Sequence, residues 1–341
     1  MIPYFLYRTF IRPLLFYAEA ESAHNLVLSA GKKLSRGPLL KVFGQKTEYR
    51  PVEVMGLKFN NPVGMAAGLD KNGEAIDFFG ALGFGFLEVG TVTPRPQPGN
   101  PLPRMFRVRE AKGIINRMGF NNKGVDYLVR NLQQRTYKGI VGVSIGKNED
   151  TPLSQAFEDY LICMDKVYQY ADYIAVNVSC PNTTDLTKLQ QAETFAALIK
   201  PLKMEQGKLA NTYNKYVPLV VKLSPDLYDA ELRSLCEVCL DLRVDGICCT
   251  NSTVSREIIH GMTHANEWGG LSGKPLFNQS TWILKKVSRM VHGAIPLIGT
   301  GGVSDAVSAR EKFHSGASLV QLYTSLVYKG PAVVKEIVDN L

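Results

Sequence analysis

Short apolar segments alternate with longer amphipathic segments from residue 51 to the C-terminus, and this alternation constrains the fold more than any other feature. Eight segments have the composition of buried strands, and each is followed by a segment whose apolar residues recur at the spacing of a helix. The predicted strands are 62–66, 85–89, 139–145, 173–178, 217–223, 246–250, 295–299 and 318–322. The predicted helices are 72–82, 121–135, 153–170, 190–209, 228–241, 276–292, 303–315 and 330–340.

Eight such units fit an α/β fold of the (β/α)8 TIM-barrel type, which takes about 250 residues. The alternative is a doubly wound open sheet, which usually has Gly-x-Gly-x-x-Gly after its first strand. The first predicted strand here is followed by Ala-Gly-Leu-Asp-Lys at 67–71, which is not that fingerprint. We therefore predict one barrel domain over residues 38–341.

Residues 1–37 form an N-terminal extension in which we expect two short helices between Tyr4 and Lys33, with a polar break at 19–22. Arg8, Arg12 and Pro13 interrupt the apolar run before it reaches the roughly 20 residues of a membrane span. An amphipathic anchor at a membrane surface and a helical hairpin packed on its own domain both fit this pattern. The arginines argue against a secretory signal, and the organelle-targeting character is weak.

Charge and cysteine content exclude several other classes. The 341 residues carry a formal charge of +8, but the Lys and Arg residues are scattered, so we expect no nucleic-acid partner. The six cysteines lack the regular spacing of a disulfide scaffold, which favours a reducing compartment. Four of them, at 236, 239, 248 and 249, fall in a predicted helix and strand and are expected to be buried rather than to bind zinc. His260 and His264 fall in a predicted loop, so we expect no metal site.

The active site of a TIM barrel lies at the C-terminal ends of its strands. Residues 177–182, Asn-Val-Ser-Cys-Pro-Asn, place the Cys180 thiol between two amides at such an end. The other strand ends share amide, hydroxyl, ammonium or small side chains: Ala67, Gly68, Lys71, Gly90, Thr91, Ser144, Lys147, Asn148, Lys222, Thr250, Asn251, Ser252, Tyr323 and Thr324. Asp70 is the one carboxylate among them, which argues against a multi-carboxylate metal site or a glycosidase pair.

Two kinds of ligand chemistry follow from these residues. Gly299-Thr300-Gly301-Gly302, before a helix expected to start at Val303, predicts a phosphate site. The amides and hydroxyls near Cys180 match the carbonyl and N–H edges of a planar substrate. Lys71 and Lys222 can hold a carboxylate or an electron-rich ring, and either can also form a Schiff base, which leaves an aldolase open as an alternative.

Several longer motifs resemble one family, the dihydroorotate dehydrogenases. They are NPVGMAAGLDKNG at 61–73, GTVTPRPQPGNPLPRMFR at 90–107, NRMGFNN at 116–122, NVSCPN at 177–182, VKLSPD at 221–226, TNST at 250–253, GGLSGKPL at 269–276 and GTGGVSD at 299–305. The helical extension and the segments at 99–107 and 116–120 are similar to the membrane-associated, quinone-using class 2 enzymes. The resemblance implies a TIM barrel that holds FMN.

The resemblance also implies roles for individual residues. It implies FMN contacts from Ala67, Gly68, Leu69, Asp70, Lys71, Thr91, Ser144, Asn177, Lys222, Thr250, Gly273, Gly302, Tyr323 and Thr324. For dihydroorotate it implies Lys71, Asn116, Arg117, Met118, Gly119, Phe120, Asn177, Asn182, Asn251 and Ser252. Cys180 is implied as the base that removes the C5 proton while hydride leaves C6 for the flavin. Ubiquinone or menaquinone would enter through a tunnel under the N-terminal helices, where His24 and Arg107 match polar positions.

Two residues depart from the class 2 pattern. Class 2 enzymes generally carry serine at the position of Cys180, and cysteine is the class 1 pattern. Ser144 stands where class 2 enzymes have an asparagine. The extension outweighs these differences, so we expect a monomeric peripheral protein on the cytoplasmic face of a bacterial inner membrane, with the mitochondrial inner membrane as the alternative. A soluble class 1-like enzyme that uses fumarate or NAD is the rival hypothesis.

Overall fold

Eight parallel strands form a closed barrel in the computed structural model, which describes residues 4–35, 37, 40–183 and 186–341. The strands are β3 (Val63–Met65), β4 (Phe86–Val92), β7 (Ile140–Ile145), β8 (Tyr173–Asn177), β9 (Leu219–Leu223), β10 (Gly246–Cys249), β12 (Leu297–Thr300) and β13 (Leu319–Leu322). They follow one another around the ring in sequence order, and β13 pairs with β3 to close it. The predicted TIM barrel is confirmed, strand by strand.

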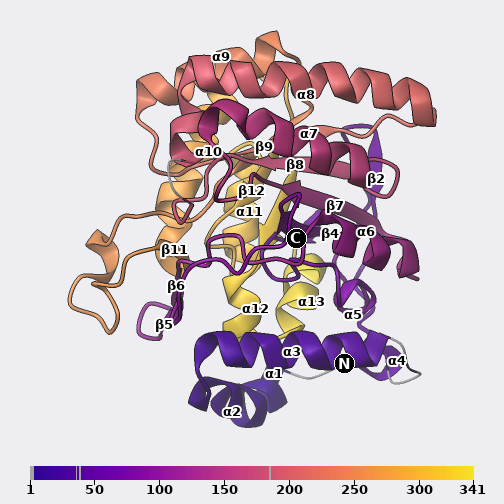
Figure 1. The fold of residues 1–341 in the computed structure, drawn as a ribbon. Helices are drawn as coiled ribbons and strands as arrows, with labels where there is room; N and C mark the ends of the chain where they lie inside the picture. The colour runs from indigo at the N-terminus through magenta and orange to yellow at the C-terminus, as the bar shows by residue number, and fades with distance from the viewer. Residues whose placement is uncertain (1–3, 36, 38–39, 184–185) are drawn as a thin grey trace.

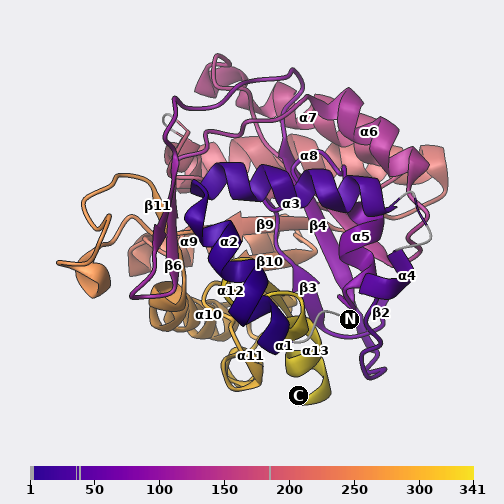
Figure 2. The same ribbon diagram turned by 90° about the horizontal axis from the view of Figure 1, so that it is seen from below.

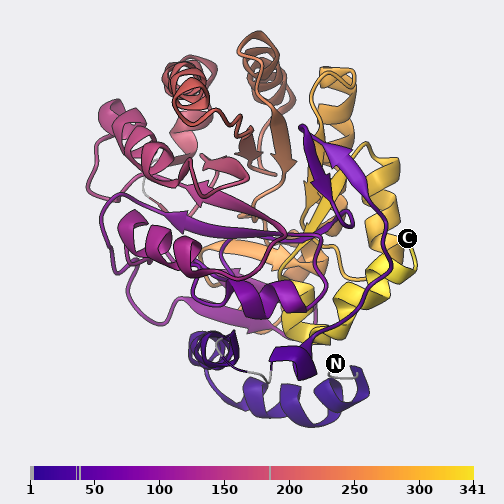
Figure 3. The same cartoon turned by 90° about the vertical axis from the view of Figure 1, so that its right-hand side faces the viewer.

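Helices surround this barrel on the outside (Figures 1 and 3). They are α5 (Ile76–Ala81), α6 (Val125–Gln134), α7 (Ala156–Val167), α8 (Ala192–Tyr213), α9 (Asp229–Asp241), α10 (Phe277–Val291), α11 (Ala306–His314), α12 (Thr324–Lys329) and α13 (Ala332–Asp339). The helix expected from 72 begins at Ile76, because Asp70 accepts backbone N–H groups from Glu74 and Ala75 and holds 70–75 in a turn. The helix expected from Val303 begins at Ala306, because Asp305 caps it by accepting from Ser308 N–H.

The barrel interior is filled by aromatic rings at its N-terminal end. Phe86 and Tyr173 lie with ring centroids 6.3 Å apart, and Phe59 packs edge-on against Phe86 at 5.2 Å. Glycines on the strands make room for these rings: a Cβ at Gly64 would lie 2.2 Å from Phe86 Cζ, and one at Gly142 would lie 2.1 Å from Tyr173 Cζ. The rings and the two glycines therefore depend on one another.

A two-stranded hairpin that the sequence analysis did not predict closes this end of the barrel. Strands β1 (Val52–Val54) and β2 (Leu57–Phe59) pair in antiparallel fashion and place Phe59 in the barrel core. The connecting residues Met55 and Gly56 both have positive φ, 55° and 72°, as a tight two-residue hairpin turn requires.

A second unpredicted sheet joins segments that are far apart in the sequence. Strands β5 (Met105–Val108), β6 (Gly113–Asn116) and β11 (Gly270–Gly273) pair antiparallel in the order β11-β6-β5. They lie to the side of the barrel in Figure 1, above the N-terminal helices. This sheet brings residues from two motifs to the same end of the barrel.

The N-terminal segment forms two helices, as predicted, that lie across the outside of the barrel (Figures 1 and 2). The first runs without a break through α1 (Tyr4–Leu6), a π-helical turn (Tyr7–Ile11) and α2 (Arg12–Tyr17), and the second is α3 (Ala20–Ser35). The predicted break at 19–22 is wrong by a few residues. The chain bends at Ala18, and Glu19 caps α3 by accepting N–H groups from Glu21 and Ser22.

A short helix, α4 (Leu40–Phe43), then leads to the barrel, and the expected boundary at Gly37-Pro38 falls partly outside the described residues. Several polar contacts fasten the segment to the barrel domain. Tyr7 donates to the Val327 carbonyl at 2.7 Å, Lys32 pairs with Glu74 at 2.8 Å, and Glu21 pairs with Arg104. In the part of the chain that the structure describes, no helix has the length and apolar composition needed to cross a membrane.

We predict that Gly64→Ala destabilises the barrel while Gly207→Ala does not. The added methyl group at 64 must displace the buried Phe86 ring, and overpacking of this kind costs about 1–3 kcal/mol. Gly207 lies exposed within α8 with no atom within 4 Å of an added Cβ, so alanine there should stabilise the helix by about 0.5–1 kcal/mol. Denaturant unfolding of both variants measures the difference, and equal unfolding midpoints would contradict the packing described for the barrel interior.

Candidate active site

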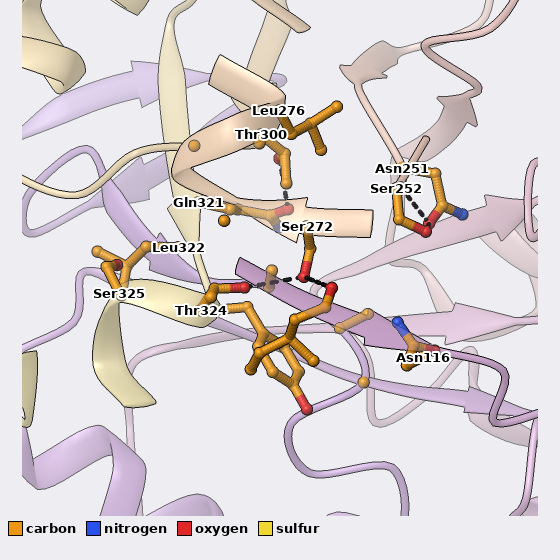
Figure 4. Close-up of a pocket in the computed structure, with 18 of the residues that line it drawn as sticks. Asn116, Asn251, Ser252, Ser272, Leu276, Thr300, Gln321, Leu322, Thr324 and Ser325 are labelled. Atoms are coloured by element: carbon orange, nitrogen blue, oxygen red, sulfur yellow. Dashed lines mark hydrogen bonds between the residues drawn. The ribbon is translucent and has the colours of Figure 1, made fainter. Parts of the chain in front are cut away.

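A cavity of about 290 Å³ opens at the C-terminal ends of the barrel strands, where sequence analysis placed the active site. Figure 4 shows Asn251 and Ser252 on one side, Leu322, Thr324 and Ser325 on the other, and Ser272 between them. The predicted residues that line it are Ala67, Gly68, Lys71, Thr91, Asn116, Met118, Gly119, Phe120, Asn177, Cys180, Asn182, Lys222, Thr250, Asn251, Ser252, Gly273, Gly302, Tyr323 and Thr324. Most of the predicted site therefore gathers around one space.

Three residues predicted to contact FMN do not line this cavity. The Asp70 carboxylate points into its own turn, and burial raises its pKa to about 6 against the opposing N–H groups of Ala75 and Glu74. Leu69 lines a different cavity, described below. Ser144 lies behind the wall, where its hydroxyl shares a 2.8 Å hydrogen bond with Thr91. Ser144 therefore acts on the cavity through Thr91, which also accepts from Asn177 Nδ2 at 2.9 Å.

Arg117, predicted to contact dihydroorotate, is also directed away from the cavity. Its guanidinium pairs with Glu267 at 2.6 Å and lies over the rings of Phe106 and Trp268 at 4.6 Å and 5.1 Å. Glu267 is 150 positions away in the sequence, so local sequence reasoning could not foresee this partner.

The cavity floor is a buried polar layer around Glu88, which the sequence analysis did not select. Glu88 Oε2 accepts from the Tyr173 hydroxyl at 2.9 Å and from Gln321 Nε2 at 2.7 Å. Lys222 Nζ lies 3.8 Å from Glu88 Oε1, an oxygen without a hydrogen-bond partner in the described chain. A buried carboxylate needs such a neighbour, because an unpaired charge is strongly disfavoured away from water. Glu88 could have been selected from the sequence, because it is an acidic residue within an otherwise apolar strand.

Cys180 lies at the wall of the cavity with an exposed fraction of 8% and a free thiol. Burial raises the pKa of this thiol, while the backbone N–H of Asn182 and the ammonium groups of Lys222 and Lys71 oppose that shift. Burial also lowers the pKa of Lys71 to about 8. The site therefore holds a thiol and a lysine whose pKa values differ from their usual ones.

Amide side chains form a hydrogen-bonded network beside the thiol. Asn251 Nδ2 donates to Asn177 Oδ1 at 3.3 Å, and Asn182 Nδ2 donates to Asn116 Oδ1 at 3.2 Å. Asn182 Oδ1 is buried without a partner in the described chain. Because an unpaired buried carbonyl oxygen is costly, this atom indicates a donor on a ligand.

The glycine-rich segment lies at the opposite end of the cavity. Gly301 and Gly302 have φ values of 103° and 77°, and a Cβ at Gly302 would lie 2.5 Å from the backbone of Phe277. The Ser325 hydroxyl nearby is buried and lacks a partner in the described chain. Backbone N–H groups, hydroxyls and lysines around one elongated cavity fit a planar group that carries a phosphate, as FMN does.

A second cavity, of about 300 Å³, lies between the N-terminal helices and the barrel. Its wall is almost entirely apolar, and its polar members include His24 and Arg107, the two residues predicted for a quinone site. Burial, followed by the charge of Lys71, lowers the pKa of His24 to about 3, so its imidazole is neutral. Arg107 donates to the Ala18 carbonyl at 2.8 Å, and its guanidinium lies 4.7 Å from the centroid of the Phe16 ring.

The two cavities share a wall. Met105, Ile114 and Tyr323 line both of them. Met105 and Ile114 come from the unpredicted sheet, and sequence analysis selected neither one. Their apolar side chains resemble ordinary core residues, so only the pairing of β5 with β6 revealed their position.

The remaining predictions about cysteines and histidines concern residues outside this site. Cys236 and Cys239 lie on α9, Cys248 and Cys249 lie on β10, and all four are buried free thiols, as expected. The segment from His260 to His264 forms turns rather than a helix, also as expected.

Comparisons with known proteins agree with this geometry. The family described as dihydroorotate dehydrogenase matches residues 50–341. The dihydroorotate dehydrogenase (quinone) of Photobacterium profundum is 53% identical over 329 residues, covering 96% of this chain and 98% of that protein. The protein of the same name from Psychromonas ingrahamii is 52% identical, covering 97% of this chain and 98% of its own.

The fold has a close counterpart among solved structures. The crystal structure of the Eimeria tenella enzyme DHODH in complex with ferulenol superimposes with a TM-score of 0.84 at 36% identity, covering 94% of this chain and 90% of that one. The near-complete matches in sequence and fold, together with the N-terminal helices, show that this chain belongs to class 2 of the dihydroorotate dehydrogenase family.

Proposed function

We propose that this protein oxidises dihydroorotate to orotate with FMN in the cavity at the strand ends and passes the electrons to a quinone in the apolar cavity under the N-terminal helices, as a step of de novo pyrimidine biosynthesis. The observation that carries the proposal is the pair of cavities, one polar and one apolar, with a common wall. A polar acid and a hydrophobic oxidant then have separate binding sites on one protein.

The cavity at the strand ends has the groups that this reaction requires. FMN, when bound, accepts a hydride from the substrate carbon next to the one that loses a proton. The residues that would hold it are Ala67, Gly68, Lys71, Thr91, Asn177, Lys222, Thr250, Gly273, Gly302, Tyr323 and Thr324. The Lys71 ammonium attracts the substrate carboxylate, and the side chains of Asn116, Asn182 and Asn251 orient its ring.

Cys180 acts as the base in this proposal. Its thiolate removes the C5 proton and holds it as a neutral thiol, while the low exposure of the site keeps bulk water from competing. The ammonium groups of Lys222 and Lys71 stabilise the thiolate before the proton is transferred. Ser144 supports the site indirectly through Thr91 rather than by direct contact.

The N-terminal segment provides the membrane contact and the quinone site. Residues 1–37 form a membrane and quinone-tunnel segment, and 38–341 form the catalytic domain. Phe5, Leu14 and Tyr17 are exposed by 67%, 75% and 96%, although large apolar and aromatic side chains are usually covered. Such a surface fits a monomeric peripheral protein whose helices dip into the cytoplasmic face of a bacterial inner membrane.

The first prediction from the proposed function compares electron acceptors. We expect purified protein to show flavin absorbance and to oxidise dihydroorotate with ubiquinone or menaquinone, and much more slowly with fumarate or NAD, because the second cavity is apolar. An aldolase would be colourless even after FMN is added. Faster turnover with fumarate or NAD than with either quinone would favour the soluble class 1-like alternative.

The second prediction concerns the base. We expect Cys180→Ala to lower kcat about 10²–10⁴-fold, the usual contribution of a general base, and Cys180→Ser to retain measurable turnover. Because burial raises the thiol pKa, kcat of the parent should increase with pH through the alkaline range. The pKa of Lys71 is about 8, so loss of its charge above that pH should raise KM for dihydroorotate. Equal rates for the parent and Cys180→Ala at every pH would show that another group removes the proton.

The third prediction concerns the membrane. Leu14→Gln combined with Tyr17→Gln removes exposed apolar surface without touching the core, so the variant should float less with phosphatidylethanolamine–phosphatidylglycerol vesicles than the parent does. Tyr228→Gln is the matched control, since Tyr228 is 79% exposed at the start of α9 on the barrel. Equal flotation of all three proteins would favour simple packing of the N-terminal helices.

A further inference from the structure

We propose that Arg104 and Asn100 are positioning residues that hold the Cys180–Asn182 segment in place and tie it, through Glu21, to the helix that lines the quinone cavity. The inference rests on the proposed function, because it assigns Cys180 as the base. It goes beyond that function because Arg104 and Asn100 do not line the cavity proposed for substrate and cofactor. Four consecutive sets of contacts carry it.

The first contact joins the N-terminal segment to the barrel domain. Arg104 Nε donates to both oxygens of Glu21, at 3.2 Å and 2.9 Å, and Nη2 donates to Oε1 at 2.8 Å. The side chains are exposed by only 11% and 7%. A buried guanidinium and carboxylate paired at both oxygens have a defined geometry, unlike a flexible surface ion pair.

The second contact extends from the same guanidinium to a loop. Arg104 Nη1 donates to the carbonyl of Pro98 at 2.6 Å and to that of Asn100 at 2.7 Å. Because the guanidinium is planar and rigid, the direction of Nη1 is fixed by the bonds that Nε and Nη2 make to Glu21. Glu21 therefore determines where residues 98–100 lie.

The third contact joins this loop to the active-site segment. Asn100 Nδ2 donates to the Arg117 carbonyl at 2.8 Å and to the Asn182 carbonyl at 3.0 Å. The loop is packed too closely to shift alone: a Cβ at Gly99 would lie 2.1 Å from the Met118 carbonyl oxygen. The position of Asn100 is thus transmitted to residue 182.

The fourth contact reaches the thiol. The backbone N–H of Asn182 faces Cys180, and the Asn182 side chain lines the cavity beside it. The hydrogen bond from Asn100 to the Asn182 carbonyl fixes the backbone of the residue whose N–H faces the thiol. The sequence of contacts therefore runs from α3 to Cys180 without a gap.

The starting point of this path gives it a functional consequence. Ala20, Ala23 and His24 line the second cavity from α3, and Glu21 lies on the same helix turn. The helix that contacts the quinone in the proposed function is therefore the one that positions the base. Loss of the link should loosen Cys180 even though the second cavity keeps its own walls.

The test uses the full-length FMN-loaded protein and three variants. Asn100→Ala removes the anchor on Asn182, and Arg104→Lys keeps a positive charge near Glu21 but cannot form the planar set of bonds. Arg109→Lys is the matched control, because Arg109 Nη2 also donates to the N-terminal segment, at the Phe16 carbonyl, but no hydrogen bond joins it to the 98–100 loop in the described chain. The primary readout is the rate at which iodoacetamide modifies Cys180, measured by peptide mass mapping.

We expect modification of Cys180 to be at least threefold faster in Asn100→Ala and Arg104→Lys than in the parent, and unchanged in Arg109→Lys. Orotate binding, followed by the change in flavin absorbance, should weaken about tenfold in the first two variants. The five other cysteines report general unfolding. Parental modification rates at Cys180 in Asn100→Ala would overturn the proposal, as would an equally large increase at Cys180 in Arg109→Lys.

The two readouts separate this inference from the proposed function. A parent protein that binds no orotate would refute the proposed function. The relative rates of Cys180 modification would still decide whether Arg104 and Asn100 position the thiol, because that measurement requires no substrate.

Discussion

A closed ring of eight parallel strands has an interior that side chains must fill, and the structure depends on how this chain fills it. Aromatic rings occupy one end because Gly64 and Gly142 leave space for them. The next layer can then be polar, since Glu88 is buried next to Lys222 and accepts hydrogen bonds from its neighbours. This change from apolar to polar along the barrel axis brings ammonium, amide and thiol groups to a single end, where they face a cavity rather than water.

The N-terminal helices are held against the barrel across an apolar cavity. They leave an apolar cavity against the barrel, and apolar contacts alone have little directional preference. Polar contacts at the margins of the cavity fix the orientation of the helices: Tyr7 donates to the Val327 carbonyl, and Lys32 pairs with Glu74. The same helices expose apolar side chains, so the segment combines an inner face held by polar contacts with an apolar exposed surface, on which the proposed membrane contact rests.

Much of this arrangement could be predicted from the sequence, because barrel strands are short apolar runs separated by helices of regular period. The location of the glycine-rich segment at 299–302 and of Cys180 at one end of the barrel was predicted for the same reason. The antiparallel sheet of β5, β6 and β11 was missed because β11 pairs with β6 across more than 150 positions, and because the segment that leads into β5 is rich in Gly, Pro and Arg. Arg117 and Asp70 matched family positions, yet their side chains turn to partners that spacing alone does not reveal. Backbone position followed from pattern, whereas side-chain direction required the fold.

The wall formed by Met105, Ile114 and Tyr323 divides two compartments of opposite polarity. In the proposed function, the water-soluble acid dihydroorotate lies on the polar side of this wall, and the lipid-soluble quinone lies on its apolar side. Because the two cavities are separated by this wall, two such compounds would not compete for the same space. The partition thus places a polar site and an apolar site back to back within one small protein, so that a single thin wall separates two opposite chemical environments.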